Sequence, residues 1–214
     1  IADTLAGQMG FSVELGQSAR EIRPDGKGWV VRTDRGEYGA RALCLATPVA
    51  TATQLLHAPF PEVTGRLAEI ETAQVESVGV ALPAARLSLP PVAGLIGRGE
   101  PFYSVVSRDT VSDAHWRGFT FHFRPGVLGE ERKLERIAQV LGIDQALLES
   151  GNVVSKLNQL PALRVGHGER ATELNQALAG HRLALVGNYF SGVAIEDCVT
   201  RSRTEFERLR GEGL

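Results

Sequence analysis

Cysteine and histidine are scarce in this sequence, and their scarcity excludes two common ways of stabilising a small domain. Two cysteines in 214 residues cannot supply a disulfide framework, and with only five scattered histidines they argue against a metal site. Both cysteines, Cys44 and Cys198, stand in apolar stretches. We therefore expect reduced, buried thiols, a cytoplasmic location and no bound metal.

An excess of positive charge and long apolar runs are also missing. The chain has 23 Lys and Arg against 25 Asp and Glu, a net charge of −2, so we expect no nucleic-acid partner. No apolar run approaches the roughly 18 residues that a membrane helix needs, and no signal peptide is visible. With 43% hydrophobic residues, the length suffices for one large domain or two small ones.

Motifs for hydrolysis, metal catalysis and phosphate binding are missing as well. We find no G-x-S-x-G, H-E-x-x-H or P-loop pattern, so the catalytic residues stay unknown. The dinucleotide fingerprint G-x-G-x-x-G is missing in context, because neither Gly36 with Gly39 nor Gly166 with Gly168 follows a buried strand. The chain opens on Ile1 within a predicted helix, and we interpret it as a fragment.

What is present in the first quarter predicts a helix, a small β-meander and a buried strand. The turn residues Pro24 to Gly28 separate two runs with β-branched and aromatic residues, which indicates a hairpin. Pro48 ends the apolar strand. The predicted segments are a helix at 1–10, strands at 11–15, 19–22, 29–33 and 41–46, and a helix at 50–56.

The middle of the chain predicts a second sheet with helices. Two prolines in residues 57–61 mark the candidate boundary. Phenylalanines alternate along residues 118–123, which is typical of a sheet core; the alternative is the wall of an apolar substrate pocket. The predicted segments are helices at 63–70, 130–141 and 145–150, strands at 75–82, 102–107, 118–123 and 152–157, and a loop at 87–99.

The last quarter predicts a helix at 168–178, a buried strand at 183–186, a glycine-containing loop and a final helix. Ile195, Val199 and Phe206 share one stripe of that helix. A helix that begins after glycines exposes unpaired N–H groups at the positive end of its dipole, which suits an anionic or carbonyl-rich ligand. The alternative is an ordinary strand-to-helix connection.

Three segments carry a resemblance to a known family. Pro161 with Val165-Gly166-His167 precedes the last strand, and residues 43–48 read LCLATP. The third segment contributes Gly187, Asn188, Gly192, Val193, Asp197 and Cys198. Together they resemble the C-terminal flavin-contacting motif of the flavin-containing amine oxidase superfamily, most of all its protoporphyrinogen oxidases. Residues 57–155 match this family only loosely.

The resemblance implies an α+β fold with two parts. Residues 1–56 and 157–214 would be the C-terminal part of an FAD-binding domain, comprising the β-meander, a strand and the C-terminal helix. Residues 57–156 would be a substrate-binding domain with a mixed sheet and helices. Because the dinucleotide motif is missing, we expect this fragment alone to be inactive and to bind FAD weakly or not at all.

The implied chemistry is hydride removal from a reduced small-molecule substrate, with electrons passed to oxygen or another acceptor. The backbone at Val193 and Ala194 would face the pyrimidine edge of the flavin. The implied cofactor-binding residues are Ala19, which would lie against the adenine, and Ala46, Thr47, Pro48, Gly187, Asn188, Gly192, Val193 and Ala194.

Other readings stay open. His167 is a catalytic candidate or, more simply, a capping residue, and Glu196 with Asp197 suits helix capping better than acid-base work. The arginines of the last helix, Arg201, Arg203, Arg208 and Arg210, suggest a solvated face. The alternative functions are a non-enzymatic binding domain that keeps half of a flavoprotein fold, and an unrelated α+β domain. The sequence does not identify the substrate, and it leaves open whether the chain forms a homodimer.

Overall fold

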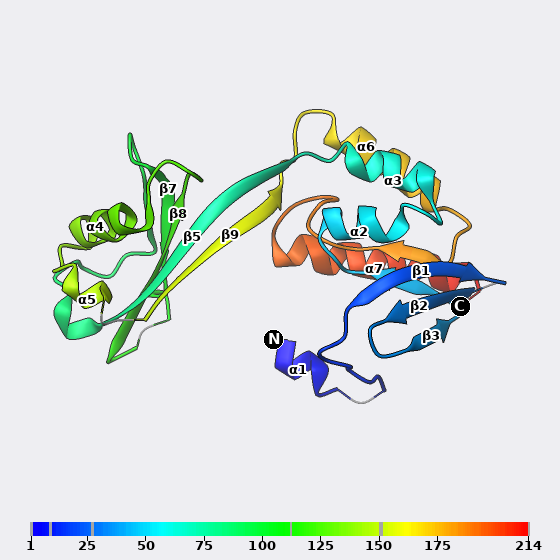
Figure 1. Cartoon of the computed structure of the whole chain (residues 1–214), viewed down its shortest axis with the longest axis horizontal. Coiled ribbons are helices and arrows are strands. Elements are labelled where there is room, and N and C mark those ends of the chain that lie inside the picture. Colours follow the sequence, from blue (N-terminus) through cyan, green and yellow to red (C-terminus); the bar gives the residue numbers. More distant parts are fainter. Residues whose placement is uncertain (1, 9, 27, 112, 150–151, 214) are drawn as a thin grey trace. The chain divides into compact units, whose positions relative to one another are not determined.

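The computed structural model describes residues 2–8, 10–26, 28–111, 113–149 and 152–213, and the chain divides into two compact units (Figure 1). The first unit comprises residues 1–71 and 161–214, and the second comprises residues 72–160. Each unit has its own hydrophobic core. No helix in the described part of the chain is long and apolar enough to cross a membrane.

The first unit begins with the short helix α1 (Ala2–Ala6) and a three-stranded antiparallel meander. Its strands are β1 (Ala19–Asp25), β2 (Gly28–Thr33) and β3 (Glu37–Ala40). Ile22 faces Val31 across the predicted hairpin, and Gly26 takes a left-handed φ of 58° in its turn. The hairpin prediction is therefore confirmed.

The strand predicted at 11–15 is wrong, and the first helix is shorter than predicted. Residues 11–15 have no regular structure, and Leu15 is 80% exposed. A strand needs a partner for its backbone groups. An apolar run without such a partner in the described chain stays irregular.

The rest of the first unit surrounds two short parallel strands, β4 (Leu43–Leu45) and β10 (Leu183–Leu185). Pro48 and Pro61 stand at the starts of α2 and α3, where a missing N–H costs nothing. Besides α1, the described helices of this unit are α2 (Val49–Leu56), α3 (Pro61–Ala68), α6 (His167–Leu178) and α7 (Ile195–Gly211).

The units change over at residues 71/72 and 160/161, which differs from the expected boundaries after residues 56 and 156. Helix α3 accounts for the first difference. Its residues Val63 and Leu67 are buried in the same core as Leu56 and Leu174, so α3 is part of the first unit. The two prolines near residue 60 begin a helix within that unit and do not mark a boundary.

The second unit is a five-stranded sheet in the order β6-β7-β8-β5-β9. Strand β6 lies in the stretch predicted to be a loop, and it pairs at the edge with β7, Gly94 opposite Val106. Strand β6 has only three residues, and the alternation that predicts a strand cannot be recognised over so short a segment. The strands are β5 (Thr72–Pro83), β6 (Gly94–Ile96), β7 (Phe102–Ser107), β8 (Trp116–Phe123) and β9 (Asn152–Pro161).

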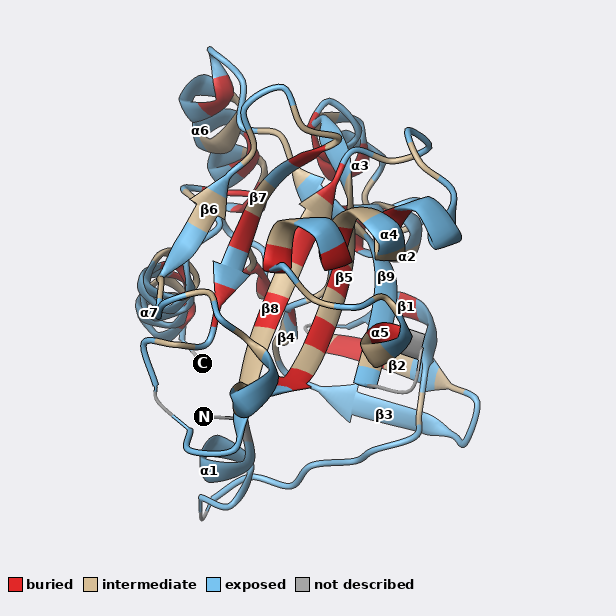
Figure 2. Cartoon of the chain, turned by 90° about the vertical axis from the view of Figure 1, so that its left-hand side faces the viewer, coloured by how far each residue is buried: buried red, intermediate tan, exposed pale blue. Residues whose placement is uncertain are grey.

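One face of this sheet packs against α4 (Glu130–Leu141). The unit also contains the short helix α5 (Ala146–Glu149) and, directly after β5, a 3₁₀ turn, η1 (Ala84–Arg86). Phe119, Phe121 and Phe123 are 2%, 0% and 1% exposed and belong to the same core as Ile137 of α4. Figure 2 shows buried residues alternating with half-buried ones along β8. The phenylalanine stripe is therefore sheet core, as predicted.

A buried ion pair fastens the loops of the second unit. Arg117 donates two hydrogen bonds to Asp109, at 2.9 Å and 2.6 Å, and the side chains are only 11% and 7% exposed. Arg117 also donates to the carbonyl of Pro90, and Asp109 accepts from the N–H of Val92. The Arg117 guanidinium holds the pKa of Asp109 below its usual range.

Replacing Asp109 is expected to destabilise the chain strongly. Asp109→Asn leaves a buried guanidinium without its counter-charge and should lower the free energy of unfolding by roughly 3 kcal/mol. The contribution of Asp109 is present above the unfolded-state pKa, near 3.9, and is lost as the pH falls through the lowered folded-state pKa. Urea denaturation at neutral and acidic pH measures both effects.

The matched control is Glu37→Gln, which removes an exposed partner of Arg23. It should change the free energy of unfolding by no more than about 1 kcal/mol. Equal effects of the two substitutions at neutral pH would contradict the stabilising role of the buried Arg117–Asp109 pair.

Candidate functional site

The carboxyl ends of β4 and β10 bring together two of the segments singled out in the sequence. The strands pair in parallel with Leu43 opposite Leu183 and Leu45 opposite Leu185. The pairing continues one step further, because the N–H of Val186 donates to the carbonyl of Leu45 at 3.0 Å. Ala46, Thr47 and Pro48 therefore leave one strand beside Gly187 and Asn188, which leave the other. Ligands of α/β folds commonly bind at such an edge.

Two helices begin at this same edge. Helix α2 follows β4 directly, with Pro48 as its first flanking residue. Helix α7 runs back along β10, since Arg201 donates to the carbonyl of Leu185 and Arg208 to that of Leu183. The start of α7 lies six residues before Arg201, about 9 Å further along the helix axis and beyond the end of β10. Both helix dipoles thus present their positive ends here.

Two glycines of the connecting loop are required by their surroundings. Gly187 has a φ of 151°, and a Cβ at this position would lie 2.8 Å from the ring of Tyr189. A Cβ at Gly192 would lie 2.0 Å from the carboxylate of Asp197. Both glycines therefore make room for side chains of the loop and helix themselves.

Asp197 caps α7, as predicted. Its carboxylate accepts a hydrogen bond from the N–H of Ala194 at 3.1 Å, the reach-back contact of a capping box. One backbone donor of the predicted ligand seat is consequently occupied by the protein's own carboxylate. Val193 is exposed and precedes the helix.

His167 holds the loop from the other side. It begins α6, is buried, and its Nε2 lies 2.9 Å from the carbonyl of Phe190. The ring nitrogen therefore donates to the backbone of the loop. This contact matches the structural role expected for His167 rather than the catalytic one.

Arg201 is the residue that the sequence reasoning missed. The sequence suggests a solvated helix face for this residue, but it is only 7% exposed. Its guanidinium donates to the carbonyl of Leu185 at 3.0 Å and to Asn175 at 2.7 Å, pairs with Glu205 at 3.1 Å, and lies 3.6 Å from the centre of the Phe190 ring. Arg201 thus joins β10, α6 and the loop to α7.

Burial of this cluster affects its protonation equilibria. Desolvation lowers the pKa of Arg201, and the charge of Glu205 opposes that effect. Burial also raises the pKa of Tyr189 above its usual value. In a sequence, a buried Arg–Glu pair at i, i+4 spacing cannot be told from an exposed pair on a solvated helix. The hydrogen bond to the Leu185 carbonyl at the end of β10 reveals the role of Arg201 only in the structure.

The expectation of a buried Cys44 is wrong, and the apolar stripe of α7 does not face the core. Ile195, Val199 and Phe206 are exposed, because the charged Arg201–Glu205 face of α7 turns inward. Cys44 is also exposed as a residue. Desolvation, and then the charge of Glu205, raise the pKa of the Cys44 thiol.

Two hydroxyl groups near the strand ends are desolvated without a hydrogen-bond partner in the described part of the chain. They are Oγ1 of Thr47, directly after β4, and the hydroxyl of Tyr189, which packs against Gly187. An unpaired buried hydroxyl costs roughly 1–3 kcal/mol. Two unpaired hydroxyl groups and two helix starts fit a polar, anionic cofactor edge.

Ala19 belongs to a different sheet from the two strand ends. It begins β1 opposite Thr33, in the separate meander sheet. The other end of the hairpin is fastened near the amino end of β10, where the indole N–H of Trp29 donates to the carbonyl of Arg182 at 2.9 Å. The remaining predicted residues lie on the strand ends or on the loop into α7.

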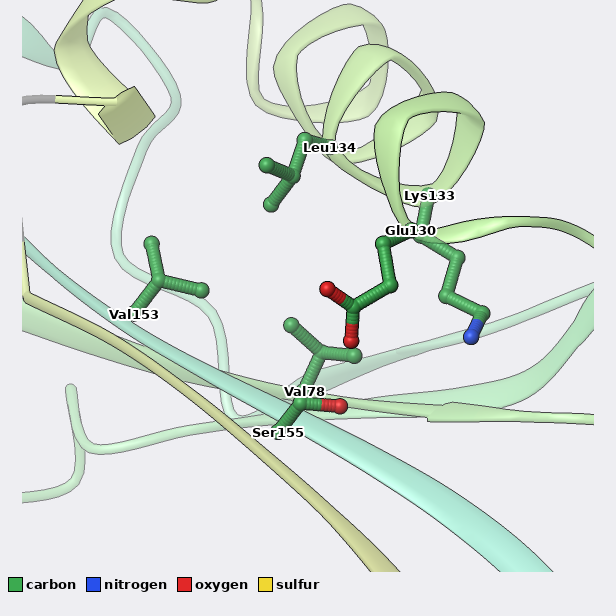
Figure 3. A pocket seen from close by; sticks show the side chains of 6 residues that line it. All are labelled: Val78, Glu130, Lys133, Leu134, Val153 and Ser155. Atoms are coloured by element: carbon green, nitrogen blue, oxygen red, sulfur yellow. The ribbon is translucent and has the colours of Figure 1, made fainter.

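The second unit contains a small cavity of its own, with a volume of about 60 Å³. Figure 3 shows Glu130 of α4 pointing toward Val78, while Lys133 runs to the side. Lys133 is already paired with Glu76, so its charge is neutralised. Among the described residues, no group of three or more His, Cys, Asp or Glu is arranged to hold a metal.

Comparison with known proteins identifies the fold. No protein-family model and no curated protein sequence matches the chain. Among solved structures, it superposes on the "putative protoporphyrinogen oxidase" of Exiguobacterium sp. 255-15 with a TM-score of 0.71 at 20% identity, over 94% of this chain and 48% of the other.

Two further structures show the same relation. A triple variant of putrescine oxidase, made to redesign cofactor binding, matches with a TM-score of 0.66 at 13% identity, over 98% of this chain and 51% of the other. A CLA-producing fatty acid isomerase from P. acnes matches with a TM-score of 0.63 at 12% identity, over 96% and 50%.

The chain therefore has the α+β fold of flavin amine oxidase superfamily proteins and spans about half the length of those it matches. The expected resemblance and fold class are confirmed.

Removing the Arg201 guanidinium is expected to loosen the whole site. Arg201→Met removes one of the two cations that pair with the buried Glu205, leaving Arg208, and removes the guanidinium donor to the Leu185 carbonyl. It should lower the free energy of unfolding by roughly 3 kcal/mol. The neighbouring exposed Arg203→Met should change it by less than about 0.5 kcal/mol. Replacing Arg201 and Glu205 together by Met and Leu should recover part of the loss. A stability of Arg201→Met equal to that of Arg203→Met in urea denaturation would disprove this role.

The two loop glycines are expected to resist substitution. Gly187→Ala strains the backbone and meets the Tyr189 ring, and should cost roughly 1–3 kcal/mol. Gly192→Ala should also destabilise, because Asp197 must leave its cap. The exposed helical Gly65 has open space at its Cβ, so Gly65→Ala should stabilise by about 0.4–1 kcal/mol. Thermal denaturation of the three variants ranks their stabilities. A Gly187→Ala variant as stable as the unsubstituted chain would be inconsistent with the loop geometry.

Proposed function

We propose that this chain is the C-terminal half of an FAD-dependent oxidoreductase of the amine oxidase type, similar in reaction to protoporphyrinogen oxidase. The observation that carries the proposal is the shared edge of β4 and β10, where the Ala-Thr-Pro and Gly-Asn segments meet between two helix starts. The fold match and the family motifs in the sequence support it independently.

In this proposal the first unit holds the flavin and the second unit holds the substrate. Thr47, Gly187, Asn188 and the backbone from Val193 onward would contact the flavin at the strand ends. The starts of α2 and α7 would stabilise negative charge on the reduced ring. His167 and Arg201 would act indirectly, by fixing the loop that carries these contacts.

The bound FAD would supply the hydride-accepting chemistry. The protein's own tasks are then to orient the substrate, exclude water and provide fixed dipoles. No side chain of the strand-end site needs to serve as acid or base, which agrees with the capping role of Asp197 and the structural bond of His167. The electron acceptor is oxygen or another oxidant.

The second candidate is a binding domain that keeps half of a flavoprotein fold without catalysis. One observation favours it: the Ala194 N–H is taken by Asp197 and is not free for a ligand. A complete gene without an upstream G-x-G-x-x-G would support this reading.

The visible absorption spectrum of the protein expressed from the complete gene distinguishes the candidates. We expect a bound-flavin spectrum that is bleached anaerobically by protoporphyrinogen. A bound-flavin spectrum that protoporphyrinogen does not bleach would support an oxidoreductase but would exclude protoporphyrinogen as its substrate. A colourless protein that gains no flavin on reconstitution would refute the proposal and favour the binding domain.

The 214-residue chain alone should bind FAD weakly or not at all, because half of the contacts to a large charged cofactor are missing from it. A yellow purified chain with flavin bound at about 1:1 would disprove this expectation.

A further inference from the structure

The backbone of the β4–β10 pair shows which groups of β4 point away from β10. The N–H of Leu43 donates to the carbonyl of Arg182 at 2.9 Å, and the carbonyl of Leu45 accepts from the N–H of Val186 at 3.0 Å. Leu43 and Leu45 therefore face β10. Successive residues of a strand direct their backbone groups to opposite edges, so the N–H and carbonyl of Cys44 face outward.

Arginine side chains close the outer edge of the other strand. In the same register, the backbone groups of Leu183 and Leu185 point away from β4. The carbonyl of Leu185 accepts from Arg201 at 3.0 Å, and that of Leu183 accepts from Arg208 at 2.6 Å. Charged side chains along an edge are one way in which proteins prevent a further strand from pairing there. The edge of β10 is thus blocked.

The outer edge of β4 is open. Within the described part of the chain, this sheet consists of β10 and β4 without a third strand. Cys44 and Ala184 stand side by side, so their side chains share one face of the sheet. Ala184 is 1% exposed, whereas Cys44 is exposed. The cover of this face therefore extends over β10 and stops at β4.

The matched structures indicate what occupies such an edge. This chain covers 48%, 51% and 50% of their lengths, so each contains about as much chain again. Parallel sheets are normally covered on both faces, and most sheets have more than two strands. A parallel pair of three residues each, with one blocked edge and one open edge, meets neither condition.

A second copy of this chain fits the edge less well. A two-fold axis would place β4 antiparallel to its copy. Cys44 is the residue of the three in β4 that faces outward, so the contact would gain the two hydrogen bonds of a single residue pair. Separate chains must also offset the entropy cost of association, which a strand tethered in the same polypeptide largely avoids.

We propose that a strand from the other half of the same polypeptide pairs with the outer edge of β4 at Cys44, and that this half also covers the sheet face on which the Cys44 side chain lies. The proposal rests on the proposed function in one respect, because it requires the second half of the flavoprotein. The edge of β4 is then the surface that joins the two halves.

Cys44→Pro tests the pairing, because proline removes the outward N–H and leaves Leu43 and Leu45 to bond with β10. In the protein from the complete gene, the folded-to-unfolded ratio should fall roughly 10- to 100-fold, because a buried hydrogen bond is lost and its acceptor stays unpaired. In the 214-residue chain, proline replaces an edge N–H and the ratio should fall less than about three-fold. Urea denaturation measures both ratios. Cys44→Val keeps the N–H and is the matched control.

Hydrogen exchange of the Cys44 amide in the complete protein reads the edge directly. We expect exchange as slow as that of the Leu45 amide, which faces β10, and unchanged when the protein is diluted. Protection that is lost on dilution would assign the edge to a second copy, and a freely exchanging Cys44 amide would show that no strand pairs there. Either result overturns the proposal, as would equal effects of Cys44→Pro in the complete protein and the 214-residue chain.

The visible spectrum of the same sample separates this proposal from the proposed function. A colourless protein with a protected Cys44 amide would refute the oxidoreductase and support the paired edge. A bound-flavin spectrum together with a freely exchanging Cys44 amide would refute the paired edge alone.

Discussion

The parallel pairing of β4 with β10 is the constraint on which the rest of the first unit depends. Three residues from each strand, separated by more than a hundred positions in the sequence, fix where Thr47 and Gly187 emerge and therefore where α2 and α7 begin. Parallel strands need cover on both faces, and the core around Leu56, Leu174 and Leu185 supplies part of it. Everything proposed about cofactor binding follows from this meeting of strand ends and helix starts.

A buried charge, not an apolar stripe, fastens α7 to these strands. Arg201 and Glu205 face inward, while Val199 and Phe206 face outward. Burying a charged pair carries a desolvation cost that apolar residues would avoid. The guanidinium offers something that an apolar side chain lacks: it satisfies the last carbonyl of β10 and stacks on Phe190 in the connecting loop. The guanidinium thus fixes the geometry of the loop, and His167 holds the same Phe190 through its carbonyl.

The sequence predicted the features that local patterns determine. The hairpin around Gly26, the phenylalanine stripe of β8 and the capping by Asp197 follow from turn chemistry, period-two alternation and helix-start preferences, and the structure contains all three. Features set by distant partners were missed. Residues 11–15 have strand-like composition without a partner, Arg201 is buried because a carbonyl of β10 lies above it, and β6 is too short to show a pattern. The candidate site was located by family motifs, whereas the positions of its supporting residues required the fold.

Hydrogen–deuterium exchange of the protein expressed from the complete gene, with and without FAD, tests most directly whether the two strand ends form one site. The account predicts that FAD slows exchange together in residues 46–49 and 187–197, and leaves the hairpin turn near Gly26 and the Gly180–Arg182 loop at the opposite end of β10 unchanged. Protection of only one of the two segments, or protection centred on Gly180–Arg182, would contradict it.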